Sequence, residues 1–197
     1  MHYTDRMSVQ NEEELIKEIQ KDPQKFGYLF DKYYKPVFGY AFRRTMMYDV
    51  SRDIAAETFL KAFLAFPSYK YRRIPVSSWI FRIAGNEIKQ YFRKNIYQPE
   101  SLNRLIENNE NLTSILSRDE NERMILEEEL LKHEEFLNVQ KALKTLGDKY
   151  QEVISLKYFE NKSIKDIAEI TGKKEGTIKS LLSRGIEKLR VMVSTNQ

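Results

Sequence analysis

The chain has 197 residues, 41% of them hydrophobic and none of them cysteine, so it can form one medium domain or two small ones but no disulfides or thiolate metal sites. Only His2 and His133 could supply an imidazole, and their wide separation argues against a histidine-based metal centre or catalytic triad. We therefore expect no cofactor and no metal. The net charge of +4 suits contact with nucleic acid without requiring it.

Apolar residues recur at helical spacing along most of the chain, and strand-like alternation is not convincing anywhere. The sequence therefore predicts an all-α protein. No apolar run approaches the roughly 20 residues that span a bilayer. The N-terminal sequence is polar and mixed in charge, unlike a signal peptide, so we expect a cytoplasmic protein without membrane insertion.

The composition divides the chain into four parts. An N-terminal segment, residues 1–22, precedes a block rich in aromatic residues and arginine, residues 23–97. Residues 98–132 are polar and acidic, and residues 133–197 return to dense helical periodicity. A polar acidic stretch between two apolar-rich blocks is typical of a linker. We therefore expect two small helical domains joined by a polar acidic linker.

The first block opens with an aromatic-rich helical pattern, in which Pro36 predicts a kink or a junction. A second helix is predicted from Ser51 or Asp53 as far as Pro67. Its inward side chains are expected to be Ile54, Phe59, Ala62, Phe63 and Phe66. On the opposite side, Asp53, Glu57 and Lys61 recur at four-residue steps, for which a solvated face is the ordinary explanation.

A loop that alternates aromatic and basic residues follows, and then a further helix. In that helix Trp79, Ile83 and Ile88 form a predicted core stripe, while cations occupy another face. Aromatic rings interleaved with cations suit single-stranded nucleic acid, because bases stack on the rings and cations follow the phosphates. The alternative is that Trp79 and Phe81 belong to the core and that the loop tyrosines, Tyr69 and Tyr71, merely cover it. We assign Trp79 to the core.

The last block predicts a helix over residues 148–160 and then two more helices. Ser163 is a suitable N-cap with Asp166 at the capping-box position, and Gly172 suits a left-handed turn. The final helix has an inner stripe and a small or cationic outer face. Its inner stripe consists of Ile178, Leu182, Ile186 and Leu189.

This pattern fits a DNA-binding helix-turn-helix and a plain helical hairpin about equally. The outer face, together with Lys173 and Lys174 at the helix start, favours DNA. Leu181 lies on the flank of the inner stripe, where it either widens the core or contacts a thymine methyl group. We favour the core.

Three stretches resemble one family, the bacterial sigma factors of the extracytoplasmic-function group, which carry only the second and fourth conserved sigma regions. These stretches read SRDIAAETFLKAFLAF, SSWIFRIAGNEIKQYFRKN and LGDKYQEVISLKYFENKSIKDIAEITGKKEGTIKSLLSRGIEKLR. The resemblance covers nearly the whole chain in the right order. The helix-turn-helix alone is a weak signal, whereas the first two stretches are far more specific.

The resemblance implies that the chain binds core RNA polymerase and directs promoter-specific initiation. The helix after Ser51 would bind the clamp helices of the largest subunit, and region 4 would meet the flap of the second-largest subunit. The acidic linker would run toward the RNA path, and an anti-sigma factor is a further expected partner. The implied polymerase-binding residues are Asp53, Glu57, Thr58, Phe59, Lys61 and Phe63.

The resemblance also implies two promoter-binding surfaces. Region 2 would capture a flipped base of the melted −10 element, and region 4 would read the −35 duplex through the major groove. The implied −10 residues are Tyr69, Lys70, Tyr71, Arg72, Arg73, Arg82, Asn86, Lys89 and Arg93. The implied −35 residues are Lys173, Lys174, Thr177, Lys179, Ser180, Ser183 and Arg184.

The chain departs from the family pattern at several positions. Gly85 replaces a larger polar or basic residue, which removes a possible DNA contact and weakens that helix. Leu181 replaces the usual arginine, so one expected −35 contact is missing or apolar and the −35 sequence cannot be carried over. Gln90 stands where an acid is common. Gly147 replaces a proline, and Glu175 replaces an apolar residue at the start of the last helix, where an acid suits the helix dipole.

Two other classes of protein remain as alternatives. A stand-alone helix-turn-helix regulator explains the last block but leaves the Trp79 helix and the basic loop without a role. An enzyme that acts on DNA, such as a recombinase, needs a nucleophile beside an activating group. The first block shows no such group, so we expect no enzymatic activity.

Overall fold

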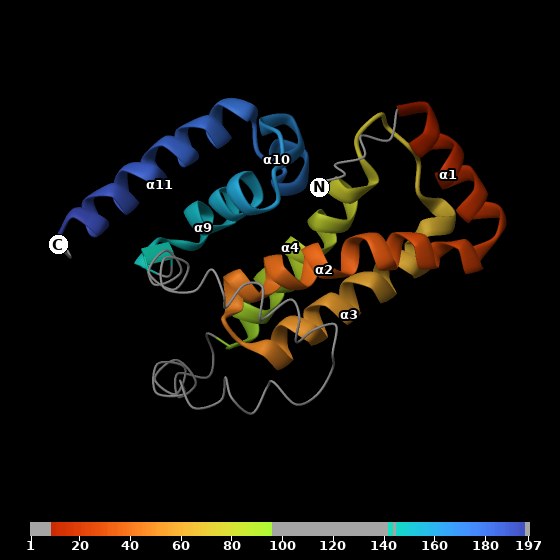
Figure 1. The fold of residues 1–197 in the computed structure, drawn as a ribbon, viewed down its shortest axis with the longest axis horizontal. Helices are drawn as coiled ribbons and strands as arrows, with labels where there is room; N and C mark the ends of the chain where they lie inside the picture. The colour runs from red at the N-terminus through yellow and green to blue at the C-terminus, as the bar shows by residue number, and fades with distance from the viewer. Residues whose placement is uncertain (1–8, 96–141, 144, 196–197) are drawn as a thin grey trace, which may run out of the picture.

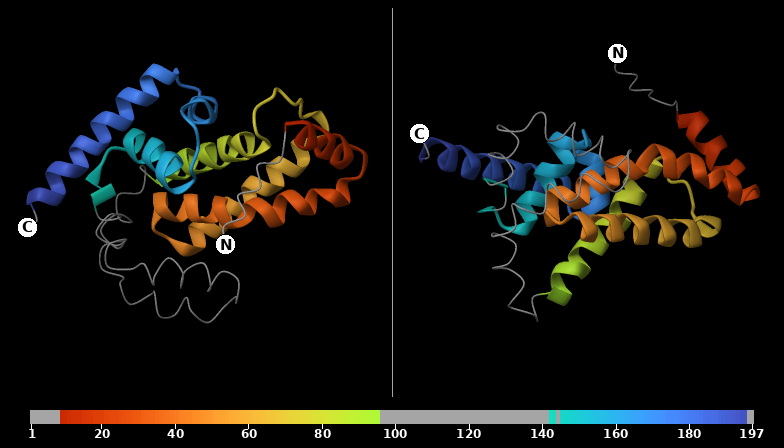
Figure 2. Two further views of the ribbon diagram at one scale, coloured as in Figure 1. Left: turned by 45° about the horizontal axis from the view of Figure 1, so that its top comes forward. Right: turned by 60° about the horizontal axis from the view of Figure 1, so that its bottom comes forward.

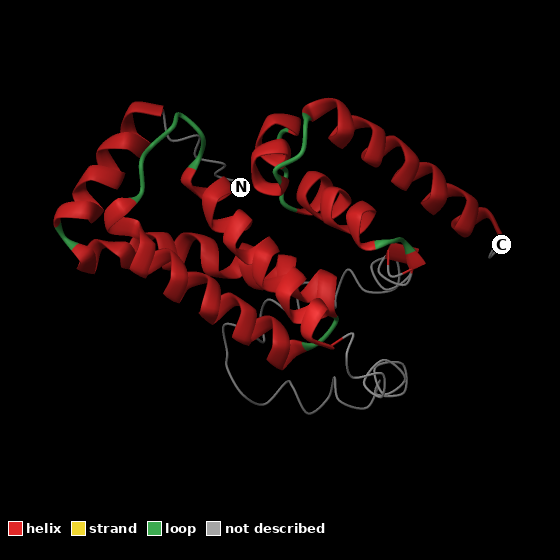
Figure 3. Ribbon diagram, turned by 180° about the vertical axis from the view of Figure 1, so that it is seen from behind, coloured by secondary structure: helices red, strands yellow, loops and turns green. Residues whose placement is uncertain are grey.

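A computed structural model of the chain describes residues 9–95, 142–143 and 145–195. Across these ranges the secondary structure is helical and contains no strand, which confirms the all-α prediction (Figure 3). The predicted linker, residues 98–132, lies outside the described residues, as do His2 and His133.

The described chain begins with a helix that the sequence analysis did not predict. Helix α1 spans Val9–Lys21 and buries Ile16 and Ile19 against the rest of the fold. It is followed by the short 3-10 helix η1, Pro23–Phe26, whose N-cap side chain, Asp22, accepts a hydrogen bond from the Gln24 amide. Residues 9–22 are therefore part of the first helical group.

Helices α2, Gly27–Thr45, and α3, Tyr48–Ala65, lie side by side (Figure 1). Of the kink or junction predicted at Pro36, the junction is wrong, because α2 continues through the proline. The residues that follow it, including Val37 and Phe38, are buried, and this packing offsets the backbone hydrogen bond that proline removes.

Helix α3 begins three residues before the predicted start at Ser51. Instead of capping the helix, the Ser51 hydroxyl is buried, 2.8 Å from the Thr45 hydroxyl, and donates to the Met47 carbonyl. These contacts hold the tight turn between α2 and α3, where Met46 has a left-handed φ of 56°. Near Pro67 the helix gives way to the 3-10 turn η2, Phe66–Ser68, as predicted.

The predicted inward face of α3 is correct except at Phe63. Ile54, Phe59, Ala62 and Phe66 are buried, whereas Phe63 is 43% exposed. The Phe63 ring instead covers the edge of Phe26, at a centroid distance of 5.3 Å. Helix α4, Val76–Asn95, then packs against α2 and α3 and completes the first helical group.

The second helical group matches the predicted helix-turn-helix. Helix α9, Asp148–Ile154, continues into the π-helical turn η3, Ser155–Phe159. Helix α10, Ile164–Thr171, and helix α11, Glu175–Thr195, follow. The predicted capping box of Ser163 and Asp166 is present, and Gly172 has the predicted left-handed conformation with φ of 71°.

The two helical groups are in contact. Helix α10 packs against α4, and η3 lies against α2, so residues far apart in the sequence lie side by side (Figures 1 and 2). Several of the predicted DNA-binding side chains lie at this contact.

Candidate nucleic-acid and polymerase surfaces

Helix α11 presents its predicted outer face to solvent. Ile178 and Leu182 are buried and fix the rotation of the helix, so Lys179 and Ser180 between them point outward. Leu181 is also buried, at 8% exposure, which supports the widened core and leaves it unavailable for a thymine methyl group. The exposed residues of the predicted set are Lys174, Thr177, Lys179, Ser180, Ser183 and Arg184.

The position of α11 depends on a close approach to α9. A Cβ atom at Gly185 would lie 2.8 Å from Ile154 Cδ1, closer than ordinary van der Waals contact. The sequence analysis did not identify this glycine, because a glycine inside a helical pattern does not reveal what packs against it. Gly185 thus helps to place the outer face of the helix.

Lys173 differs from the other predicted −35 residues. Its Nζ lies 3.6 Å from Oε2 of Glu152, a carboxylate on α9 whose side chain is only 2% exposed. Lys173 is therefore engaged within the protein, whereas Lys174 beside it is exposed.

In the predicted −10 loop the aromatic rings pack on the core, whereas the cations are exposed. The Tyr69 ring lies 4.7 Å from the ring of Trp79 and stacks on Phe66, and burial raises the pKa of Tyr69 to about 12. Tyr71 is also partly buried, so these rings cover the core, as the alternative interpretation expected. The loop cations are exposed, namely Lys70, Arg72 and Arg73.

Trp79 packs against the core without being fully buried. Its ring lies 6.0 Å from that of Phe66, and it supports the Tyr69 ring. Trp79 therefore contacts the core, as predicted, but is only partly buried.

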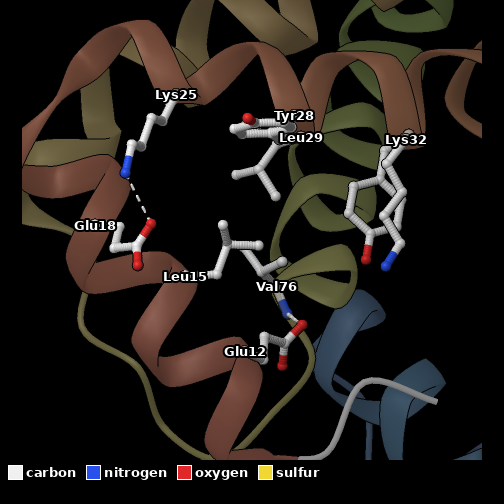
Figure 4. A pocket seen from close by; sticks show the side chains of 9 residues that line it. Glu12, Leu15, Glu18, Lys25, Tyr28, Leu29, Lys32 and Val76 are labelled. Atoms are coloured by element: carbon white, nitrogen blue, oxygen red, sulfur yellow. Dashed lines mark hydrogen bonds and ion pairs between the residues drawn. The ribbon is translucent and has the colours of Figure 1, made fainter. Parts of the chain in front are cut away.

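Helix α1 holds both ends of the predicted −10 loop. Gln20 Nε2 donates to the carbonyls of Phe66 and Tyr69, at 3.2 and 2.7 Å, and Glu12 Oε1 accepts from the Val76 amide at 3.0 Å. A pocket of about 400 Å³ lies beside these contacts, between α1, α2 and the start of α4 (Figure 4). The loop is thus anchored at its start and at its end.

Helix α4 carries the remaining predicted −10 residues, and two of them are paired. Arg82 Nη1 lies 3.2 Å from Oε1 of Glu169 on α10, and Lys89 Nζ lies 2.8 Å from Oε1 of Glu152. Asn86 and Arg93 are exposed, as expected for a binding face. The sequence analysis missed both acids, because an isolated glutamate in a helical pattern resembles an ordinary surface residue.

The predicted polymerase helix, α3, places its residues in three environments. Thr58 and Phe59 are buried, so direct contact of these two side chains with a partner would require them to leave the core. Lys61 Nζ lies 3.2 Å from Glu57 Oε1 and 2.7 Å from Glu87 Oε2 on α4. Two members of the predicted charged row, Glu57 and Lys61, are therefore paired within the protein. Asp53 and Phe63 are exposed.

The same helix exposes an apolar surface of which the sequence analysis identified only Phe63. Leu60 and Leu64 lie one helical turn apart and are 52% and 68% exposed, and Phe63 lies between them. Exposed clusters of large apolar side chains mark sites of protein interaction more often than single exposed residues do. We call Leu60, Phe63 and Leu64 the apolar α3 surface.

Within the described residues, no cluster of histidine and acidic side chains could hold a metal ion. The helices of the same residues include none with the length and hydropathy needed to cross a membrane.

Two family descriptions match the chain, and they match its two helical groups. The family described as Sigma-70 region 2 matches residues 29–96, and the family described as Sigma-70, region 4 matches residues 136–189.

Characterised relatives match over most of the chain. The ECF RNA polymerase sigma factor SigW of Bacillus subtilis is 30% identical over 89% of this chain and 92% of its own length. The ECF RNA polymerase sigma-E factor of Haemophilus influenzae is also 30% identical, over 88% of this chain and 90% of its own length. BldN of Streptomyces coelicolor is 26% identical over 89% of this chain, which spans 63% of BldN.

Solved structures share the fold. CnrH, in complex with the cytosolic domain of CnrY, aligns with a TM-score of 0.68 at 18% identity, covering 94% of this chain and 99% of that one. The sigma factor RpoE of Bartonella quintana, in complex with the anti-sigma factor NepR, aligns with a TM-score of 0.64 at 20% identity, covering 88% and 99%. With both sigma-70 regions matched in order and with relatives at 30% identity over nearly their full length, the chain belongs to the extracytoplasmic-function family of RNA polymerase sigma factors.

Proposed function

We propose that this sigma factor joins core RNA polymerase through α3 and directs it to promoters by reading the −35 duplex with α11 and the melted −10 element with α4 and its preceding loop. The observation that carries the proposal is the presence, on one chain, of an outward helix-turn-helix face and a separate apolar α3 surface. A stand-alone regulator would need the helix-turn-helix face, but that function would not explain the apolar α3 surface.

At the −35 element, α11 would enter the major groove. Lys179 and Arg184 are its exposed long cations of the predicted set, and the hydroxyls of Thr177, Ser180 and Ser183 lie on the same stretch of helix. Such side chains suit base edges and phosphates, while Lys174 at the helix start suits a phosphate.

At the −10 element, the exposed cations of the loop and of α4 would follow the single strand. Lys70, Arg72 and Arg73 precede α4, and Asn86 and Arg93 lie along it. Since Tyr69 and Tyr71 are packed on the core, we propose that they shape the loop and that base stacking on them requires the loop to move. Capture of an unstacked base would then help to open the duplex.

At the polymerase, the apolar α3 surface would supply the buried centre of the contact, and exposed Asp53 would supply a charged rim. The clamp helices of the largest subunit are the proposed partner there, and the flap of the second-largest subunit is the proposed partner of region 4. An anti-sigma factor is a further proposed partner, since the similar sigma factor RpoE of Bartonella quintana is solved in complex with the anti-sigma factor NepR. We propose no catalytic role for the chain itself.

Transcription reconstituted from purified components tests the proposal. The chain is added to core polymerase with genomic promoter fragments, and specific transcripts are sought. The proposal expects initiation that depends on both the chain and the polymerase. If no initiation occurs, yet the chain binds an operator tightly without polymerase, the promoter-directing role is wrong.

A further inference from the structure

The predicted −10 loop, residues 69–75, has no regular secondary structure, yet its backbone takes a specific shape. Arg73 has a left-handed φ of 57°, which residues other than glycine seldom adopt. A conformation of this kind persists only where surrounding contacts determine it, and such conformations cluster at functional sites. The contacts that hold this loop therefore bear on what the loop binds.

The start of the loop is held by Gln20, near the C-terminal end of α1. Gln20 Nε2 donates to the carbonyl oxygens of Phe66 and Tyr69, at 3.2 and 2.7 Å. A side-chain amide carries two N–H groups, so one glutamine can satisfy both carbonyls. Tyr69 is the first residue beyond η2, so Gln20 fixes the point at which the chain leaves that helical turn.

The end of the loop is held by Glu12, about two turns earlier on α1. Its Oε1 accepts from the amide of Val76, the first residue of α4, at 3.0 Å (Figure 4). The first amides of a helix have no partner within it, and Pro75 offers no side-chain acceptor. An acid 64 residues away in the sequence therefore takes the place of a local N-cap, and its charge suits the helix dipole.

Glu12 also contacts the middle of the loop. Its carboxylate forms a hydrogen bond with Tyr71, and burial together with the negative charge of Glu12 raises the pKa of that tyrosine. The Tyr69 ring lies against Trp79. The inner side of the loop is thus held by α1 and by the core, which leaves the loop cations on the outer side.

Glu12 and Gln20 are suited to act on the loop and not on DNA. Glu12 is an acid beside a surface that the proposed function assigns to phosphates, and Gln20 uses its amide within the protein. A loop that is already ordered loses less conformational freedom when a strand binds, so its binding is tighter and more selective. With the loop held, the strand follows the outer side while the tyrosine rings stay on the core.

We propose that Gln20 and Glu12, which we call the α1 anchor, are positioning residues for −10 recognition. The inference rests on the proposed function for the identity of the ligand, the melted −10 strand. The anchor fixes the start of the loop relative to the start of α4, so the loop cations and the exposed face of α4 form one surface. Loss of the anchor lowers discrimination among −10 sequences and leaves −35 recognition unchanged.

Four variants of the full chain test the proposal. Glu12→Ala removes the acceptor, whereas Glu12→Gln removes the charge but keeps a carbonyl oxygen. Gln20→Met removes both donors at nearly constant length. Gln24→Met is the matched control, because it makes the same change at an exposed glutamine of η1.

Amide hydrogen exchange in the free chain measures the anchor itself. Glu12→Ala and Gln20→Met should each speed exchange at residues 69–76 about threefold to tenfold, the factor expected for the loss of one hydrogen bond. Exchange in α11 should not change, because that helix does not depend on the anchor. Glu12→Gln and Gln24→Met should match the unaltered chain.

Recognition is measured with reconstituted holoenzyme and forked oligonucleotides that carry a −10 sequence found in the transcription experiment, or base-substituted versions of it. In Glu12→Ala and Gln20→Met, the preference for the promoter sequence should shrink about threefold to tenfold, with binding of the −35 duplex unchanged. The sign of the effect at Glu12 separates the anchor from simple charge. Loss of a nearby acid would by itself tighten DNA binding in both Glu12 variants. The anchor instead predicts weaker −10 binding for Glu12→Ala and no loss for Glu12→Gln.

Folded Glu12→Ala and Gln20→Met variants that keep either the exchange at residues 69–76 or the −10 preference of the unaltered chain overturn the proposal. If circular dichroism shows that one of them does not fold, the other decides. Equal weakening in Glu12→Gln and Glu12→Ala also overturns it, because the acceptor would then not be the feature that matters. Failure of the unaltered chain to capture core polymerase refutes the proposed function, whereas exchange in the free chain still reports on the anchor.

Discussion

Lys179 and Arg184 are the side chains of α11 on which promoter preference is expected to depend most. Both are exposed, on the side of the helix away from the buried Ile178 and Leu182. If they read bases, Lys179→Ala or Arg184→Ala should each cost about 1–3 kcal/mol of promoter binding and relax the preference at one −35 position. Arg190→Ala, which removes an exposed cation later in the same helix, is the matched control. Holoenzyme binding to a library of −35 sequences measures the effect, and a uniform loss across all sequences would make the two residues phosphate contacts.

Tyr69 gives a prediction about alkaline stability. Its pKa is raised to about 12 by burial, as is that of Tyr33. In the unfolded chain these phenols ionise near pH 10. The stability gained by burying them in their neutral form is therefore complete below pH 10 and is lost as the pH rises toward about 12. Denaturant unfolding should show this loss, and Tyr69→Phe should reduce it. An equally steep loss in the Phe variant would mean that Tyr69 is not held in its packed position.

The two glycines of α11 are expected to respond to alanine in opposite directions. At Gly185 the added methyl would meet Ile154, and overpacking of this kind costs about 1–3 kcal/mol. At Gly176 nothing lies within 4 Å of the added methyl, so the better helix propensity should stabilise the protein by about 0.5 kcal/mol. Thermal unfolding of the two variants measures the difference. Equal effects would show that α9 and α11 do not approach as closely as described.

The apolar α3 surface should matter for polymerase binding but not for folding. Leu60→Glu and Leu64→Glu change exposed side chains, so stability should shift by no more than about 0.5 kcal/mol. Loss of an apolar anchor at an interface centre should weaken core polymerase binding at least about tenfold. Val191→Glu, at an exposed apolar residue of α11, is the control. Undiminished binding by both α3 variants would move the polymerase contact elsewhere.

At the scale of elements, the features that could be predicted are those that depend on neighbours in sequence. The Ser163 capping box and the turn at Gly172 were predicted because each acts within one turn of helix. The junction expected at Pro36 was not found, because burial of the residues that follow it outweighs the local preference of proline. Helix α1 was missed because its apolar stripe is short. It is stabilised by contacts with the predicted −10 loop, which lies far away in the sequence.

At the scale of the whole molecule, the resemblance predicted both regions and their surfaces but not their contact. Arg43, Arg44 and Glu152 are buried charges, and charged residues in a helical pattern ordinarily predict solvated faces. Their burial follows from complementary charge on another part of the chain, which no local pattern encodes. Arg82 and Lys89, expected on a free DNA surface, are therefore engaged by acids of region 4.

The central claim is that the chain reads promoters only as a subunit of polymerase. The most direct measurement is a footprint of one promoter, with permanganate to detect unpaired thymines, using the chain alone and then the chain with core polymerase. The account predicts −35 protection and −10 reactivity only when both proteins are present. Equal protection of the duplex by the chain alone, without −10 opening when polymerase is added, would contradict it.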